Sequence, residues 1–153
     1  KVVCYSRSLT PGRRTPEGYD ILGYEELLKC ADVVSFHTAL TPDTHHLLDA
    51  RCMSLMKDSA VVVNTSRGAV IDTLALAEAL QADKLRGAGI DVFEGEPVDP
   101  GHPLMKAPHT VLSPHVAYWS EESGVELRTR AMQAAIDVVT GARPKDCLNP
   151  EVL

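Results

Sequence analysis

The chain has 153 residues, 44% of them hydrophobic, which is enough for one domain with a buried core. Its formal net charge of −6 argues against a nucleic-acid surface, which is normally basic. No apolar run reaches the roughly 18 residues that span a membrane. The cysteines form no CxxC pair, and they are Cys4, Cys30, Cys52 and Cys147. These features predict a cytoplasmic protein with free thiols that binds neither nucleic acid nor membrane, and the even number of cysteines leaves disulfides as the alternative.

Short apolar runs alternate with amphipathic segments along the chain. The apolar runs predict strands at Val2–Tyr5, Val33–Phe36, Ala60–Asn64, Gly87–Val92 and Thr110–Ser113. Helices are predicted at Tyr24–Cys30, at Ala50–Met56 after an Asp49 cap, at Thr73–Ala82 after Asp72, and at 121–140 after Ser120. Most strands are unbroken apolar stretches, as expected of strands that are covered on both faces. The alternation predicts an α/β fold with a parallel sheet and right-handed crossovers.

Polar or ionisable residues follow every predicted strand. In an open parallel sheet, ligands bind beyond the carboxyl ends of the strands. The sequence therefore predicts a ligand site along this edge of the sheet. The segments that follow the strands are Ser6–Ser8, His37–Ala39, Thr65–Gly68, Asp91–Glu96 and His115.

Three kinds of residue at these strand ends favour a catalytic site when they occur together. Arg67 follows a buried strand, and its planar guanidinium could hold a carboxylate. His115 follows an apolar strand and a proline, and one carboxylate of Asp91–Glu96 could orient its imidazole. Each residue alone has a common structural explanation, such as a surface ion pair, so only the combination indicates catalysis.

Four ordered segments resemble one enzyme family. The segments DVVSFHTALTPDTHHLL, VVVNTSRGAVID, LRGAGIDVFEGEP and TVLSPHVAYWSEES are similar to motifs of the D-isomer-specific 2-hydroxyacid dehydrogenases, with Ala39 where proline is usual. The resemblance covers nearly the whole chain and implies a doubly wound, Rossmann-type nucleotide-binding domain. It also implies an oxidoreductase that transfers a hydride between NADPH or NADH and a small 2-oxo acid, such as glyoxylate or hydroxypyruvate. The intact enzyme would be a homodimer.

The resemblance implies roles for individual residues. Arg67 would bind the substrate carboxylate and carbonyl, and His115 would be the acid/base. Glu96 would be the partner of His115, because it directly precedes Pro97 as in the family motif. Asp91 matches the position that holds the nicotinamide carboxamide. Arg67 and His115 also match positions that line the cofactor, together with His37, Ala39, Thr44, Thr65, Ser66 and Ala117.

The Ser6-Arg7-Ser8 ending indicates which cofactor is used. The second strand of this fold usually ends in an acid that hydrogen-bonds the adenosine ribose hydroxyls, and Ser6 stands near that place. Without the carboxylate nothing repels a ribose 2′-phosphate, and Ser6, Arg7 and Ser8 could bind it. The sequence therefore favours NADP, with NAD as the alternative cofactor. The other interpretation is a solvated basic loop.

No Gly-x-Gly-x-x-Gly turn occurs in the chain, and Lys1–Tyr5 resembles the second strand of the fold. We therefore interpret residues 1–153 as a partial dinucleotide-binding domain that lacks its first strand and Gly-rich turn. Residues 141–153 would be a tail leading back toward an absent substrate domain. We expect the absent strand to lie between Val2–Tyr5 and Ala60–Asn64. Alone, the 153 residues should be poorly folded or associated, and inactive.

A binding protein is the alternative from another functional class. Transcriptional corepressors of the C-terminal-binding-protein type share the fold and the same Arg, Glu and His, and they bind NAD and peptides. Their aromatic pair after the histidine resembles Tyr118-Trp119. The Ser6-Arg7 ending counts against this function, because those proteins keep the acidic ending. A third alternative is an enzyme of this fold that acts on another acid, such as phosphite.

Two further residue groups have structural interpretations. The adjacent His45 and His46 could suggest a metal, but no Cys, Asp or Glu spacing in the sequence completes a tetrahedral site. We expect solvated or helix-capping roles for them. Glu94 lies in a run of acids, and a solvated side chain is expected there as well.

Overall fold

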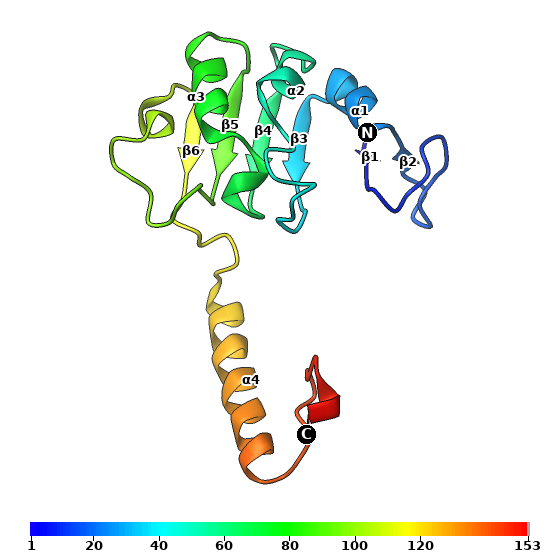
Figure 1. Cartoon of the computed structure of the whole chain (residues 1–153), viewed down its shortest axis with the longest axis vertical. Helices are drawn as coiled ribbons and strands as arrows, with labels where there is room; N and C mark the ends of the chain where they lie inside the picture. The colour runs from blue at the N-terminus through cyan, green and yellow to red at the C-terminus, as the bar shows by residue number, and fades with distance from the viewer. Residues whose placement is uncertain (153) are drawn as a thin grey trace. The chain divides into compact units, whose positions relative to one another are not determined.

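The computed structural model describes residues 1–152 and divides the chain into two units, Lys1–His115 and Val116–Leu153. The first unit contains all the strands and three α-helices, and the second contains one long helix (Figure 1). No helix in the described residues is long and apolar enough to cross a membrane.

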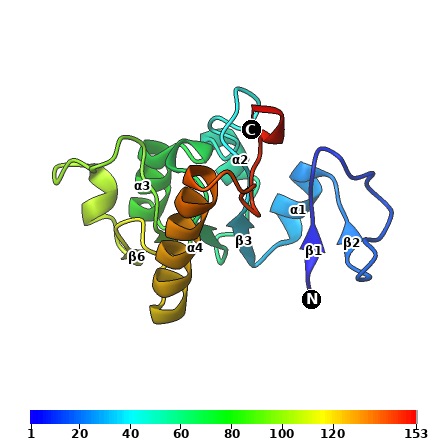
Figure 2. The ribbon, with the colours of Figure 1, turned by 90° about the horizontal axis from the view of Figure 1, so that it is seen from below.

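A four-stranded parallel sheet forms the centre of the first unit, with the order β3-β4-β5-β6. Its strands are β3 (Val33–Phe36), β4 (Val61–Asn64), β5 (Gly87–Ile90) and β6 (Thr110–Leu112). A second parallel pair consists of β1 (Val3–Cys4) and β2 (Asp20–Ile21) and lies beside α1 (Figure 2). The helices are α1 (Tyr24–Cys30), α2 (Ala50–Ser54), α3 (Thr73–Gln81) and α4 (Glu121–Val139). Short 3₁₀ turns are η1 (Gly68–Val70), η2 (Pro103–Lys106) and η3 (Pro150–Val152).

The predicted α/β fold with a parallel sheet is confirmed. Every predicted strand and helix is present, with ends that differ by at most two residues. The capping predictions are also confirmed, because Asp49, Asp72 and Ser120 each accept a hydrogen bond from the backbone N–H three residues later. The sequence reading missed β2, because two residues inside a Pro- and Gly-rich segment give no apolar run that could indicate a strand.

The core of the first unit lies on one face of the four-stranded sheet. Val62 of β4 is fully buried with Leu76 and Leu80 of α3, and Met53 of α2 joins them. The residues that alternate with the core positions are exposed at the sheet edges, and Val111 of β6 is 75% exposed. The expectation that the strands are covered on both faces is therefore wrong within the first unit, where the helices that join the strands pack on a single face.

The strand order corrects one expectation from the sequence. An absent first strand was expected to lie between Val2–Tyr5 and Ala60–Asn64, and so to pair with β4. Strand β4 is hydrogen-bonded on both edges, because Val62 is in register with Val34 of β3 and with Ala88 of β5. No edge of β4 is available, and the prediction was wrong. The physical reason is that a short crossover through α2 places the consecutive strands β3 and β4 side by side, the usual outcome for sequential parallel strands.

The second unit is built around α4. The Trp119 ring packs against Gly124, where an added Cβ would lie 2.9 Å from the ring. Arg130 joins the helix to the segment that follows, through hydrogen bonds to Asp146. The helix ends at the Thr140 cap, after which Gly141 adopts a φ of 77° that favours glycine. Sequence analysis placed this helix end correctly.

Candidate active site

Asn64, the last residue of β4, organises the turn that carries Arg67. Its buried Oδ1 accepts hydrogen bonds from the Ser66 backbone N–H at 3.0 Å and from the Ser66 hydroxyl at 2.9 Å. Its Nδ2 donates to the Arg67 carbonyl at 3.0 Å. Sequence analysis did not select Asn64, although a polar residue that ends the apolar run VVVN was a usable signal. The turn is therefore positioned by a buried amide rather than by Arg67 itself.

The Arg67 side chain is exposed at this turn. In the described part of the chain, the only hydrogen bond of its guanidinium goes from Nη1 to the Ser66 carbonyl, at 2.7 Å. The neighbouring Thr65 is exposed as well. The next residue, Gly68, is buried so close to the loop after β5 that an added Cβ would lie 2.0 Å from the Phe93 carbonyl. The Arg67 turn and the Phe93 loop are thus packed backbone to backbone.

The structure brings His115 and Glu96 together. His115 Nδ1 lies 2.7 Å from Glu96 Oε2, and Glu96 Oε1 accepts a hydrogen bond from the Phe93 backbone N–H at 3.0 Å. These two hydrogen bonds, with that of His115 first, hold the pKa of Glu96 below its ordinary value. His115 has a φ of 56°, in the left-handed region that a residue with a side chain rarely adopts. The two strand-end loops after β5 and β6 therefore meet in a carboxylate–imidazole pair.

Asp91 directly follows the last residue of β5. The residue is 3% exposed, and its Oδ1 accepts a hydrogen bond from the Ser113 hydroxyl at 2.6 Å. Its carbonyl accepts the His115 backbone N–H at 2.8 Å, which attaches the histidine loop to β5. Within residues 1–152, Arg67 forms no hydrogen bond or ion pair with Glu96 or His115, so these three side chains are not one connected network.

The segment after β3 forms a compact turn. The buried Thr44 hydroxyl donates to the Ala39 carbonyl at 2.7 Å and accepts from the Thr41 N–H at 2.8 Å. His37 Nε2 lies 2.8 Å from the Ser35 hydroxyl. The Thr38 hydroxyl is buried and has no hydrogen-bond partner among the described residues. An orphaned hydroxyl costs free energy, so this position can accept a partner from a ligand.

The Ser6-Arg7-Ser8 ending forms a turn of its own. The two serine hydroxyls lie 3.1 Å apart, and Arg7 forms an ion pair with Asp43 from the turn after β3. The basic loop that follows is attached to β2, because Arg14 Nε lies 2.9 Å from Asp20 Oδ1. Ala117 belongs to the second unit.

Glu94 and His46 correct two sequence-based expectations. Glu94 Oε2 lies 2.9 Å from His46 Nε2, and Glu94 Oε1 accepts hydrogen bonds from the backbone N–H and hydroxyl of Thr73. Burial raises the pKa of Glu94, but the hydrogen bonds from His46 and Thr73 outweigh it and hold the pKa below its ordinary value. Glu94 is therefore not a solvated acid, and His46 is neither solvated nor a helix cap. The pairing joins residues 48 positions apart, which local spacing cannot reveal.

Comparisons with known proteins agree on one family. The model of the NAD binding domain of the D-isomer specific 2-hydroxyacid dehydrogenases matches residues 1–117. A glyoxylate reductase of Aeropyrum pernix is 35% identical over all 153 residues, which cover 46% of that protein. A glyoxylate/hydroxypyruvate reductase B of Citrobacter koseri is 39% identical over 128 residues, 84% of this chain and 40% of that protein. The chain thus spans less than half the length of these relatives.

A solved structure gives the same result. The NAD-complexed D-isomer specific 2-hydroxyacid dehydrogenase of Lactobacillus delbrueckii ssp. bulgaricus superposes with a TM-score of 0.82 at 31% identity. The superposition covers 97% of this chain and 49% of that one. The fold, including the parallel sheet that places the strand-end loops, is therefore that of a Rossmann-type dehydrogenase domain.

Proposed function

This chain belongs to the D-isomer-specific 2-hydroxyacid dehydrogenase family, and from that premise we propose that its protein interconverts a small 2-oxo acid and the corresponding D-2-hydroxy acid. The names of the relatives favour glyoxylate or hydroxypyruvate as the oxo acid. The observation that carries the proposal is the 2.7 Å contact between His115 and Glu96 at the carboxyl edge of the sheet. A carboxylate that orients an imidazole beside a ligand edge is the arrangement of a general acid/base.

His115 is the proposed acid/base in both directions. Its Nδ1 is engaged by Glu96, so Nε2 is the nitrogen that can exchange a proton with the substrate oxygen. Glu96 stabilises the protonated imidazole and fixes the orientation of the ring. The Phe93 N–H holds the other carboxylate oxygen, which keeps Glu96 ionised and in place.

Arg67 is the proposed binding residue for the substrate carboxylate. Its guanidinium is exposed at the same edge of the sheet, and a planar fork binds a carboxylate through two parallel hydrogen bonds. Asn64 and Gly68 would act as positioning residues, because the first holds the Arg67 turn and the second permits its close approach to Phe93. Substrate binding would thus depend on the backbone of the turn as well as on the arginine.

A nicotinamide cofactor, when bound, supplies the hydride. The donor set at the strand ends fits such a ligand: the orphaned Thr38 hydroxyl lies after β3, and the Asp91 carboxylate lies at the end of β5. His37, Ala39, Thr65 and Ser66 are proposed to line the same site, and the cofactor role of Ala117, which belongs to the second unit, stays a prediction from the family resemblance. Thr44 contributes through the turn that it holds.

We propose NADP as the preferred cofactor, with NAD as the alternative. Ser6 and Ser8 offer hydroxyls to a ribose 2′-phosphate, and Arg7 offers a guanidinium. Arg7 is engaged by Asp43, but both side chains are mostly exposed, and such pairs contribute at most about 1 kcal/mol. A doubly charged phosphate can therefore displace Asp43.

Turnover assays separate this function from the corepressor alternative. Rapid NADPH oxidation with glyoxylate or hydroxypyruvate by the whole protein that carries this chain would support the dehydrogenase. Peptide binding without turnover would instead support the corepressor. The relatives reported above are reductases and dehydrogenases, which favours the enzyme.

Assembly and location complete the proposal. We propose a cytoplasmic homodimer, on the basis of the family resemblance. Light scattering coupled to size-exclusion chromatography would give twice the monomer mass, and a monomer would contradict the proposed assembly.

A further inference from the structure

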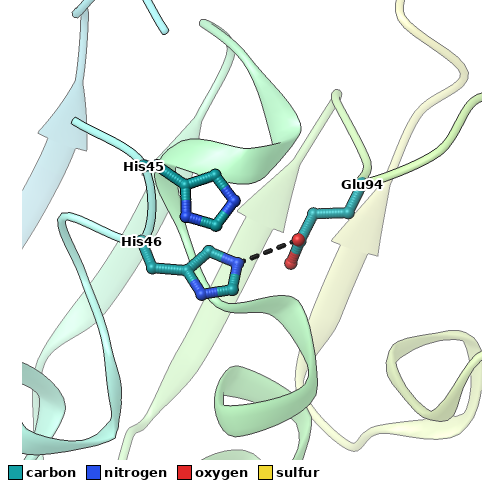
Figure 3. Close-up of side chains that lie close together, drawn as sticks. All are labelled: His45, His46 and Glu94. Atoms are coloured by element: carbon teal, nitrogen blue, oxygen red, sulfur yellow. Dashed lines mark hydrogen bonds and ion pairs between the residues drawn. The ribbon is translucent and has the colours of Figure 1, made fainter. Parts of the chain in front are cut away.

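His45, His46 and Glu94 bring three metal-ligating side chains together at the carboxyl edge of the sheet (Figure 3). One ligand atom from each residue lies within 4.8 Å of the ligand atoms of the other two. The two imidazole rings are stacked, with centroids 4.1 Å apart and an angle of 25° between their planes. Both rings present a nitrogen on the side of the Glu94 carboxylate (Figure 3). We call these three residues the His-His-Glu cluster.

We propose that the His-His-Glu cluster binds one divalent transition-metal ion, with Zn²⁺ as the best match. Two imidazoles and a carboxylate are ligands that zinc accepts readily, and a water molecule or a small anion would occupy the fourth position. This site goes beyond the proposed dehydrogenase function and does not depend on it. It takes no part in the proton exchange at His115.

The distances require only a small rearrangement. Ligand atoms about 2.0–2.2 Å from a tetrahedral zinc ion lie roughly 3.3 Å from one another. His46 Nε2 and Glu94 Oε2, at 2.9 Å, are already near that spacing. His45 is exposed, so a rotation of its side chain can bring its ring nitrogen the remaining ångström or so closer to the other two ligand atoms without disturbing the core. The metal replaces the proton shared between His46 and Glu94, and that proton passes to solvent.

Two of the three ligands are held in place by neighbouring groups. Glu94 Oε1 accepts 3.0 Å hydrogen bonds from the Thr73 N–H and hydroxyl, which leaves Oε2 for the cluster. The His46 backbone has a φ of 48°, in the left-handed region, and its N–H donates to the Ala69 carbonyl at 2.8 Å. Neighbours that orient ligating carboxylates and imidazoles are typical of metal sites. Loss of such a neighbour commonly weakens metal binding about 10–100-fold.

The local charge also favours a cation. Asp72 Oδ2 lies 3.9 Å from His46 Nδ1, so His46 stands between two carboxylates. The competing explanation is that His46 and Glu94 form only a structural ion pair that attaches the His46 turn to α3. Under that explanation the cluster binds no metal, and His45 has no role in it. Replacing His45 therefore discriminates between the metal site and the structural ion pair.

The test is isothermal titration calorimetry of the whole protein with ZnCl₂, comparing the native protein with His45→Ala. The matched control is His109→Asn, which removes another exposed histidine and suits its left-handed φ of 57°. We expect one strong site per chain in the native protein and in the control. In His45→Ala the dissociation constant for zinc should rise at least about tenfold. The loss of a ligand weakens metal binding at least as much as the loss of a neighbour that orients a ligand. Absence of a strong site in the native protein, or equal affinity in His45→Ala, would overturn the proposal.

A second variant tests the carboxylate. Glu94→Gln keeps an acceptor for Thr73 and removes the ligand charge, and its fold is checked by circular dichroism. If the folded variant binds zinc as tightly as the native protein, the carboxylate is not a ligand and the proposal fails. If the variant does not fold, the His45→Ala result decides alone. Neither readout uses turnover, so failure of the metal site and failure of the proposed dehydrogenase are distinguishable.

Discussion

Arg7 and Asp43 form an ion pair that joins the Ser6-Arg7-Ser8 ending to the turn after β3. The two residues are 36 positions apart, and both side chains are largely exposed, at 58% and 71%. The pair holds the guanidinium between two strand-end loops, where a cofactor phosphate would compete with Asp43. If Arg7 binds the cofactor phosphate as proposed, cofactor choice depends on both Arg7 and Asp43.

Arg7→Ala should remove most of the preference for NADPH over NADH. A charge-assisted hydrogen bond contributes roughly 1.5–3 kcal/mol, which corresponds to a preference of about tenfold or more. The measurement is kcat/KM for both cofactors in the whole protein. Asp43→Asn is the matched variant and should leave the preference intact or strengthen it, because it frees Arg7. A native preference for NADH would contradict the interpretation of the Ser-Arg-Ser ending.

His115→Ala and Arg67→Ala should each reduce turnover severely and leave the fold intact. The loss of an acid/base group typically costs about 10²–10⁴-fold. Both side chains are exposed, so neither removal opens a cavity in the core. Steady-state kinetics with glyoxylate and NADPH measure the loss, and circular dichroism checks the fold. His109→Asn should retain native turnover, and near-native rates in either active-site variant would remove that residue from the mechanism.

Glu96→Gln should move the pH optimum of the reduction to lower pH. Because the His115 hydrogen bond holds the pKa of Glu96 below its ordinary value, the carboxylate is ionised at neutral pH and stabilises the protonated imidazole. The amide lacks that charge and no longer stabilises the proton-donating form of the acid/base pair. The readout is the profile of kcat/KM against pH. An unchanged profile would exclude Glu96 from proton exchange.

Gly68→Ala should destabilise the first unit and displace the Arg67 turn. The new Cβ would lie 2.0 Å from the Phe93 carbonyl, so one backbone must move, and overpacking of this kind costs about 1–3 kcal/mol. Gly89→Ala is the matched control, because its nearest contact would be an ordinary 3.9 Å to Val63. Urea unfolding measures the free energy of unfolding of both variants. The KM for the oxo acid should rise in Gly68→Ala only. Equal stability of the two variants would contradict the close approach.

Asp49 should make the stability of the protein depend on acid pH. Its hydrogen bond from the Cys52 N–H, at 2.7 Å, holds its pKa below the ordinary value. A lowered folded-state pKa stabilises the protein above the unfolded value of about 3.9, and this contribution is lost as pH falls through the folded value. Asp49→Asn keeps the cap without the charge, so its Tm should decline less between about pH 5 and pH 2. Parallel Tm profiles of both proteins would contradict the assignment.

The sequence by itself determined the α-helices, five of the six strands and the edge of the sheet that carries the polar residues. Apolar runs such as Val33–Phe36 and caps such as Asp49 and Asp72 depend on neighbours a few positions away, so their signals are local. The family resemblance of the motif around Glu96 and Pro97 indicated the right carboxylate for His115, a contact across 19 positions that local spacing alone does not predict. Local sequence patterns therefore sufficed for the apolar runs and the helix caps.

Only the tertiary structure decided which distant residues meet. The pairing of β4 with both β3 and β5, the engagement of Arg7 by Asp43, and the approach of Gly68 to Phe93 all join segments that sequence spacing leaves independent. The same is true of the His-His-Glu cluster, where Glu94 reaches His46 across 48 positions and was therefore misjudged as a solvated acid. These contacts depend on how parallel crossovers place strand ends beside one another, a property of the packed sheet rather than of any single segment.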